Sequence, residues 1–349
     1  GTWSNASFPA ITALAVCGFL RRSGSAPAKE RETPVVKKAL AYLAGCAQPD
    51  GGIYVPAKNP GEGGLKNYNT AICLLALAES GDPAYEPLMR KARASLAAWQ
   101  YLESDACYGG MGYDPVERKG KPSQADLSNT MMAVEALRRT EYLEAGEQGK
   151  KLQEERKKAG ETGKGFNWEA AVKFLSRCQH LPESNDQKWV SQKQEERGGF
   201  VYSPVESKAG EAKAEGEAPE GGGGKEASYL RSYGSMSYAG LLSFIYARVD
   251  RTDRRVQAAV SWLEKNYTVE ENPRMGKQGL YYYYHTMAKA LSAYGVDELE
   301  LASGRKVAWR KELSQRLLNL QQKDGSWSND NGRWLERDPA LVTSYAVVA

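Results

Sequence analysis

The stretch ALAYLAGCAQPDGGIY at residues 39–54 joins an amphipathic segment to a glycine-rich turn. Ala39, Tyr42 and Leu43 stand at helical spacing, so they are predicted to lie on one face of a helix. The two glycines that follow predict the end of that helix and a tight turn with positive φ. Related stretches recur at residues 96–113, 171–200, 259–281 and 317–327. The sequence therefore predicts a repeated unit.

A second class of segment follows the turns and can be aligned on one hydroxyl residue. The aligned residues are Thr12, Thr70, Thr130, Ser237, Thr286 and Thr343. Three positions further on, one helical turn along the same face, five of the six segments carry a small residue and the sixth carries Lys289. Small residues on one stripe let helices approach closely, which favours an inner ring of packed helices. The hydroxyls are expected to cap a helix or to bond back to the preceding turn.

Each repeat is thus predicted to be an outer helix, a turn and an inner helix, neither of which buries its apolar face alone. We count five segments of the first class and six of the second. The prediction is an all-α protein, an (α/α)6 toroid in one domain over residues 1–349, with one outer helix missing before Gly1. Two low-complexity or charged segments, at about 144–165 and 206–228, are predicted to be mobile insertions on one rim.

Charge and composition exclude some classes of function. Lys and Arg total 47 against 43 for Asp and Glu, a net charge of +4, which does not indicate a nucleic-acid partner. No stretch approaches the ~20 apolar residues of a membrane-spanning helix. The five cysteines show no C-x-x-C spacing and are predicted to be buried free thiols. No cofactor is predicted, and the compartment stays open.

The spacing Gln-x-x-x-Gly-x-aromatic occurs at residues 48–54 and 321–327. It resembles the QW motif that is repeated through squalene and oxidosqualene cyclases, relatives of the protein prenyltransferases. The resemblance covers nearly the whole chain. It implies the toroid fold, in which the glutamine and the aromatic residue tie outer helices to turns. It implies structure and not a reaction.

In those cyclases the acid that protonates the substrate lies in Asp-x-Asp-Asp-Thr, at the start of an inner helix. The matching stretch here runs from Asp126 to Thr130, and Ser128 stands at the acid's position. An isolated alkene is so weak a base that only an unusually strong carboxylic acid protonates it. Asp126 remains the candidate acid, with a helix cap as its alternative role. Ser128 and Asn129 are candidate cavity residues.

The related prenyltransferases bind zinc through Asp, Cys and a His in a Tyr-His-Thr segment, which Tyr284-His285-Thr286 resembles. Residues 229–238, where repeat alignment would place the Asp and the Cys, contain neither. No metal site is therefore predicted. His285 is kept as a candidate catalytic residue, and its alternative role is a buried, hydrogen-bonded histidine.

Four consecutive tyrosines, residues 281–284, open another inner helix. Successive helical side chains point in different directions, so at least one should face a central cavity while another packs outward. Tyr281, Tyr282, Tyr284 and Tyr238 are the candidate cavity aromatics, because aromatic faces stabilise carbocations in the cyclases.

Three functions remain open. The first is a toroid protein that handles an isoprenoid or another apolar ligand, and the second is a non-catalytic lipid-binding or protein-interaction scaffold. The third, a glycoside hydrolase, would need Asp126 and Asp338 to face each other across the cavity. A cavity lined by apolar and aromatic residues would favour an isoprenoid, whereas a filled core would favour a scaffold.

Overall fold

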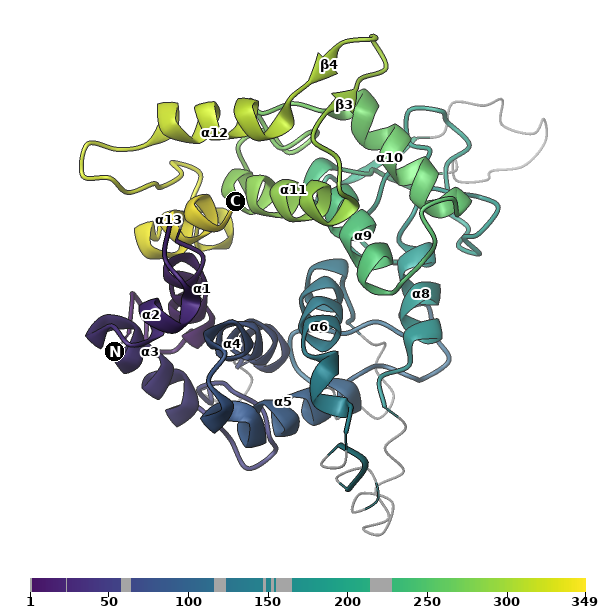
Figure 1. Ribbon diagram of the computed structural model, residues 1–349. Helices are drawn as coiled ribbons and strands as arrows, with labels where there is room; N and C mark the ends of the chain where they lie inside the picture. Colours follow the sequence, from purple (N-terminus) through teal and green to yellow (C-terminus); the bar gives the residue numbers. More distant parts are fainter. Residues whose placement is uncertain are drawn as a thin grey trace, which may run out of the picture.

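A computed structural model of the chain describes residues 2–22, 24–57, 64–115, 124–146, 149–151, 154, 165–213 and 228–349 (Figure 1). The described residues are mostly helical, and their strands are only two or three residues long. The prediction of an all-α protein is therefore confirmed.

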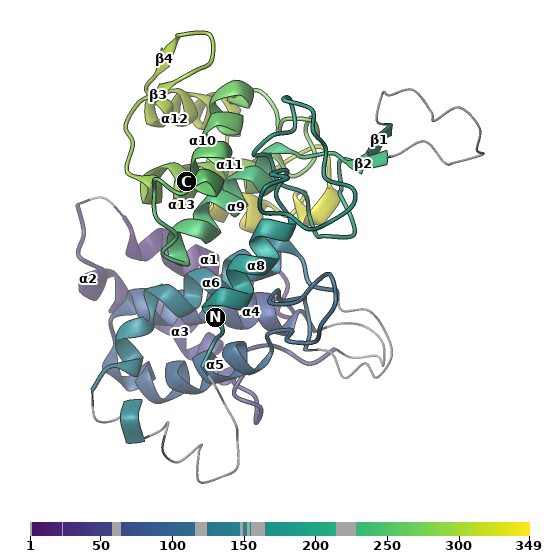
Figure 2. The ribbon, with the colours of Figure 1, turned by 90° about the vertical axis from the view of Figure 1, so that its right-hand side faces the viewer.

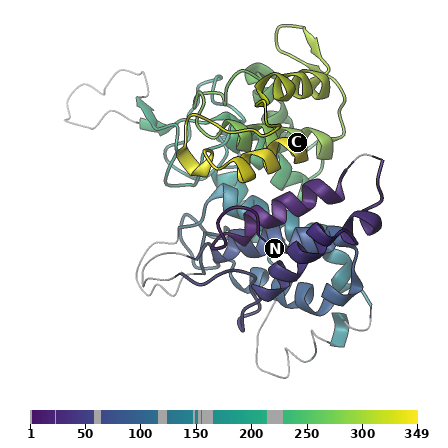
Figure 3. The ribbon, with the colours of Figure 1, turned by 90° about the vertical axis from the view of Figure 1, so that its left-hand side faces the viewer.

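Six inner helices contact one another in cyclic order. Each helix contacts the next one along the chain. The last helix contacts the first, although these two are far apart in the sequence (Figures 1 and 3). Small and apolar residues occur on all sides of most of them, which suits helices that are surrounded by other helices. In chain order the inner helices are α1 (Pro9–Leu20), α4 (Lys66–Ser80), α6 (Leu127–Arg139), α9 (Gly234–Tyr246), α11 (Leu280–Tyr294) and α13 (Pro339–Val348).

Among the described residues, five further helices of at least ten residues lie outside the inner ones (Figure 1). They bury one face only, as α10 does with Val256, Ala259 and Leu263. This spacing matches the amphipathic pattern of the sequence. The outer helices are α3 (Pro34–Gly45), α5 (Glu86–Ala98), α8 (Trp168–Arg177), α10 (Arg254–Asn266) and α12 (Trp309–Leu320).

The remaining described elements are short and lie in the connections. They are α2 (Pro27–Arg31), η1 (Pro83–Tyr85), η2 (Glu141–Glu144), β1 (Glu211–Lys213), β2 (Ser228–Leu230), β3 (Leu299–Glu300), β4 (Lys306–Val307) and η3 (Arg333–Leu335).

The glycine turns after the outer helices have the predicted positive φ. At Gly109 φ is 90°, and an added Cβ would overlap the carbonyl oxygen of Ala170 in α8. The turn therefore packs directly on the next outer helix, an approach that only glycine permits. Gly325 has a similar φ of 85°, but the nearest atom to its Cβ position is Gln321 Nε2 at 3.9 Å.

Glutamines hold these turns to the next outer helix. Gln100 Nε2 donates to the carbonyl oxygens of Gly109 and Asn167, at 2.9 Å each, and Asn167 is the N-cap of α8. Gln179 Nε2 likewise donates to Gly198 and, at 2.8 Å, to Arg255 in the first turn of α10. One side chain thus joins a turn to a helix.

The aligned hydroxyls lie on the six inner helices, and five of them accept a backbone N–H from the preceding turn. These bonds place the turn and the inner helix in a fixed register, because each buried N–H finds its partner there. The bonds are Trp3 N to Thr12 at 3.1 Å, Ile53 N to Thr70 at 2.9 Å, Met111 N to Thr130 at 3.0 Å, Phe200 N to Ser237 at 3.1 Å and Trp327 N to Thr343 at 3.1 Å.

The repeat that contains Thr286 differs. The stretch at residues 278–281 was expected to be a glycine turn, but Gly279 is the N-cap of α11, which begins at Leu280. Gln278 and Gly279 do form a turn, and Gly279 has the predicted positive φ of 60°, but Leu280 and Tyr281 already belong to the helix. Two tyrosine hydroxyls hold the preceding loop instead: Tyr283 donates to the carbonyl oxygen of Thr268 at 2.7 Å, and Tyr284 to that of Val269 at 2.6 Å.

The two predicted insertions fall largely outside the described residues, at 147–148, 152–153, 155–164 and 214–227. Their described ends attach at opposite ends of the inner helices (Figure 2). Residues 141–146 follow the C-terminus of α6, whereas β1 pairs with β2 shortly before the N-terminus of α9. The expectation of one common rim is thus corrected.

All five cysteines are buried and free, as predicted. None of the described helices is long and apolar enough to cross a membrane.

Candidate functional site

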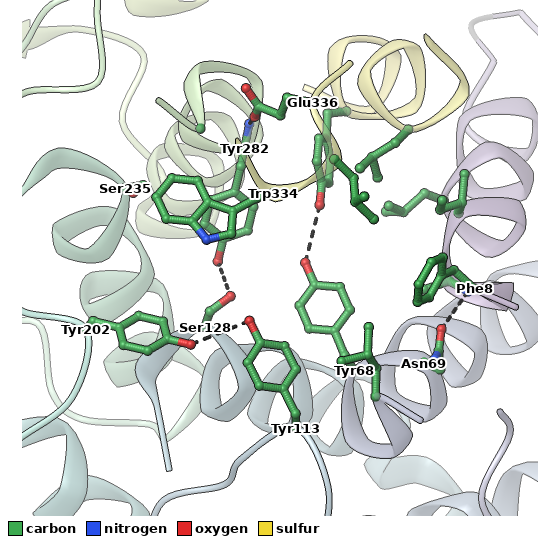
Figure 4. A pocket seen from close by; sticks show the side chains of 18 of the residues that line it. Phe8, Tyr68, Asn69, Tyr113, Ser128, Tyr202, Ser235, Tyr282, Trp334 and Glu336 are labelled. Carbon is green, nitrogen blue, oxygen red and sulfur yellow. Dashed lines mark hydrogen bonds between the residues drawn. The ribbon is translucent and has the colours of Figure 1, made fainter. Parts of the chain in front are cut away.

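A cavity of about 290 Å³ lies where the N-terminal ends of the inner helices meet (Figure 4). Every inner helix contributes a residue from its first turn to the wall. These residues are Ile11, Tyr68, Ser128, Ser235, Tyr282 and Leu341. Since all six helices begin at this cavity, they run in the same direction.

The register of the aligned hydroxyls explains which side chains reach the cavity. The aligned hydroxyl faces the turn that lies outside its inner helix. The residue two positions earlier lies about 200° away around the helix and therefore faces the centre of the ring of inner helices. That position lines the cavity on five inner helices, as Ala10, Tyr68, Ser128, Ser235 and Leu341. This signal in the sequence would have identified Tyr68. On α11, which lacks the turn contact, the cavity residue is Tyr282, four positions before Thr286.

The wall is mainly aromatic and aliphatic, and five of the six tyrosines in the described lining have a hydroxyl that pairs with another hydroxyl. Ser128 Oγ and the Tyr282 hydroxyl lie 2.8 Å apart, and those of Tyr68 and Tyr345 lie 3.3 Å apart (Figure 4). A third contact, 3.5 Å long, joins Tyr202 to Tyr113. Burial raises the pKa of Tyr68 and of Tyr282 well above the usual value, so these phenols stay neutral hydrogen-bond donors.

Asp126 is the N-cap of α6, as its alternative role predicted. One carboxylate oxygen accepts the Asn129 backbone N–H at 2.8 Å, and the other accepts the Asn129 side-chain N–H at 2.8 Å. Asp126 is 2% exposed and lies behind the cavity wall, where burial raises its pKa to about 6. Asn129 is fully buried and is also behind the wall, so only Ser128 of this motif is a lining residue.

His285 lies on α11, outside the described cavity lining. It is 1% exposed, and its ring centroid is 5.1 Å from that of Tyr345. Neither ring nitrogen has a hydrogen-bond partner of normal geometry among the described residues, and the backbone of Tyr345 is the polar group that acts on its pKa as a hydrogen-bond partner. Burial, followed by the charge of Lys289, holds its pKa well below the ordinary value. His285 is therefore a neutral, buried side chain.

A series of ion pairs crosses the interior toward the other end of the inner helices. Arg21 pairs with Glu79, Glu79 with Arg139 at 2.7 Å, and Glu135 with Lys289. Arg21 and Arg139 stand at the C-terminal ends of α1 and α6. Glu135 is fully buried. Glu135 and Lys289 lie in the interior, whereas the side chains of Arg21 and Arg139 are 35% and 36% exposed, so the series runs from the interior to the surface at this end.

Among the four consecutive tyrosines, Tyr282 is the one that lines the described cavity. The Tyr284 hydroxyl is bonded to the loop at Val269, and Tyr281 packs edge-on against Tyr284 with centroids 5.8 Å apart. Tyr238 packs against Tyr283 at 5.6 Å. Tyr281, Tyr284 and Tyr238 were expected to line the cavity, and the structure places them behind its wall.

The loop between α12 and α13 supplies a part of the wall that sequence reasoning missed. Glu336 is fully buried and accepts hydrogen bonds from the Tyr282 backbone N–H at 2.8 Å and from Asn329 Nδ2 at 2.6 Å. It thus caps α11, whose own N-cap is Gly279. Burial raises the Glu336 pKa to about 7.

Trp334 and Leu335 precede this glutamate and also line the cavity, as Figure 4 shows for Trp334. Both have positive φ, 57° and 65°, a conformation that costs a bulky residue of order 1–3 kcal/mol. Trp334 is 42% exposed and packs over Gly279. The buried hydrogen bonds of Glu336 hold the loop in this conformation.

No family model matches the chain, and no curated protein matches it either. Within the part of the chain that the structure describes, no group of three or more His, Cys, Asp or Glu side chains is arranged to hold a metal ion.

Proposed function

We propose that this chain is an (α/α)6 toroid whose central cavity binds an apolar small molecule of the isoprenoid class. The observation that carries the proposal is the cavity itself, with aromatic and aliphatic side chains from all six inner helices. The cyclic contacts of those helices support the toroid, and the resemblance to squalene cyclases and prenyltransferases supports the ligand class. An unfilled cavity favours a ligand-binding protein over a scaffold with a filled core.

The size of the cavity limits the ligand. A dry cavity of ~150 Å³ holds one benzene ring, so about 290 Å³ corresponds to roughly a dozen carbon atoms. Each buried CH2 group stabilises a bound chain by about 0.8 kcal/mol before the costs of association. The proposed ligand is therefore an isoprenoid of about ten to fifteen carbon atoms, shorter than squalene.

The proposed role is binding without proton-initiated cyclisation. One carboxylate oxygen of Asp126 caps α6 and the other bonds to the Asn129 side chain, and the lining residue of this motif is Ser128, whose hydroxyl is a very weak acid. His285 is buried away from the described lining. The tyrosine rings would contact the ligand through their apolar faces.

The test is thermal unfolding with farnesene, a 15-carbon hydrocarbon that carries no polar group. Mass action stabilises the folded state by about 2.7 kcal/mol at a ligand concentration of 100 Kd, which raises the Tm by several degrees. Leu14→Phe adds bulk inside the cavity and should reduce this shift, whereas Leu318→Phe, at a residue that is 62% exposed on α12, should preserve it. No shift in the parent protein, or equal shifts in both variants, would refute the proposal.

A further inference from the structure

The hydroxyl pair of Ser128 and Tyr282 has one O–H donor more than its mutual hydrogen bond requires. Each hydroxyl has one O–H, and their mutual hydrogen bond at 2.8 Å consumes one of the two. Among the described residues neither hydroxyl has another hydrogen-bond partner, so one O–H donor and the remaining serine lone pairs are free to meet a ligand. Both residues line the cavity, from α6 and α11 (Figure 4).

A second pair lies close to the first. The hydroxyls of Tyr68 and Tyr345, 3.3 Å apart, also share two O–H groups in one bond. The two pairs are near enough for Tyr68 and Tyr282 to influence each other electrostatically. The polar part of the cavity includes this small cluster of neutral hydroxyls besides Asn69, Ser235 and Glu336. Ile11, Leu14 and Leu341 supply an apolar surface.

The charges near this cluster have both signs. Lys208 and Arg333 lie over the rings of the lining residues Tyr202 and Trp334, at 4.4 and 4.3 Å, and two carboxyl groups are also close. After burial, the Asp126 carboxylate is among the further causes that raise the pKa of Tyr68 and Tyr282. Glu336 contributes a second carboxyl group, and the described lining includes no lysine or arginine. A diphosphate needs cations or a metal ion to be stable out of water. A neutral hydroxyl group needs only hydrogen-bond partners, which the cluster provides.

We infer that the ligand is a terpenoid alcohol, whose hydroxyl group bonds to the Ser128–Tyr282 pair while its hydrocarbon chain occupies the apolar part of the cavity. This inference rests on the proposed function. In this arrangement Ser128 donates its hydrogen bond to Tyr282, and the Tyr282 O–H donates a hydrogen bond to the alcohol oxygen. The alcohol O–H in turn donates a hydrogen bond to Ser128 Oγ. A prenyl diphosphate would meet no lysine or arginine in the described lining and is not the inferred ligand.

The experiment compares farnesol, farnesene and farnesyl diphosphate, which share one 15-carbon chain and differ at its end. Apparent Kd values come from the ligand-dependent rise in Tm. For the parent protein we expect farnesol to bind most tightly and the diphosphate most weakly. Tyr282→Phe should weaken farnesol binding about threefold to tenfold, the loss of one neutral hydrogen bond, and leave farnesene binding unchanged. Ser128→Ala should act in the same way.

Tyr281→Phe is the matched control, because Tyr281 is the adjacent tyrosine on α11 and is absent from the described lining. It should leave all three Kd values unchanged. Tightest binding by the diphosphate, or farnesol binding that neither Tyr282→Phe nor Ser128→Ala weakens, would overturn this inference while farnesene binding still upheld the proposed function. Failure of all three ligands to bind would overturn both.

Discussion

At Gly109 and Gly325 the same turn conformation meets different surroundings. Both residues have φ near 90°, but the Cβ position of Gly109 is blocked by α8, whereas that of Gly325 is open. An alanine at Gly325 would incur only the cost of the left-handed conformation, about 1–2 kcal/mol. At Gly109 it would also have to displace a helix backbone.

We therefore expect Gly109→Ala to lower the free energy of unfolding more than Gly325→Ala does, by about 1–3 kcal/mol. Urea denaturation of the two variants measures this difference. Equal destabilisation would show that α8 does not lie against the turn in solution.

His285 should make stability depend on pH. Its pKa in the folded protein is held well below 6.5, where it faces the ring of Tyr345 and the charges of Lys289 and Arg21. Below pH 6.5 the unfolded chain binds a proton that the folded protein does not, so stability is lost as the pH falls. This loss amounts to about 1.4 kcal/mol per pH unit until the folded pKa is reached.

The comparison of the parent protein with His285→Phe isolates this effect. Asp126 and Glu336 have raised pKa values and act in the opposite direction, but they are present in both proteins. Between pH 7.5 and 5.5 the parent should lose more unfolding free energy than the variant does. Identical pH profiles would mean that His285 is protonated or exposed in the folded state.

Among the elements, the bond from a turn N–H to a hydroxyl on the next inner helix is the recurring contact. Thr70 accepts the Ile53 N–H at 2.9 Å, but Thr286 bonds only to backbone carbonyls of its own helix in the described contacts. Thr70→Val would leave a buried N–H unpaired and should cost about 1–3 kcal/mol. Thr286→Val leaves no N–H without its acceptor and should cost less than ~1 kcal/mol. Chemical denaturation of both variants provides the check, and the reverse order would contradict the role of the hydroxyls.

The sequence predicts these elements well where the repeat is regular. Helical spacing and glycine turns identify the outer helices, and one hydroxyl identifies each inner helix. The prediction holds only in part at residues 278–281, because Gly279 turns with positive φ but α11 begins directly after it, and tyrosine hydroxyls hold the preceding loop. Trp334 and Glu336 could not be assigned to the cavity, because a buried contact between α11 and the loop before α13 places them there.

Across the whole molecule, an ion pair between Glu135 and Lys289 joins α6 to α11 through the interior. In the cyclic order α9 stands between these two helices. Lys289 occupies the position where the other inner helices carry small residues, and this ion pair accounts for the exception. Lys289→Met would leave a fully buried carboxylate with only its weaker contact to Arg139 at 3.9 Å and to the Tyr246 hydroxyl. It should cost about 3–5 kcal/mol.

Removing both charges should cost much less than removing one. In Glu135→Leu combined with Lys289→Met, no unpaired charge remains, and apolar side chains of similar size replace the pair. A double-mutant cycle by urea unfolding gives the coupling energy. A double variant as unstable as the sum of the single variants would show that the two residues are not paired.

The most direct test of ligand binding by the cavity is X-ray diffraction from crystals grown with 1-bromodecane, recorded at the bromine absorption edge. If the cavity at the N-terminal ends of the inner helices binds an apolar molecule, the anomalous map should show bromine inside it, between Ile11, Tyr68 and Trp334. Bromine peaks confined to the protein surface, with the cavity empty or filled by ordered water, would contradict the proposed function.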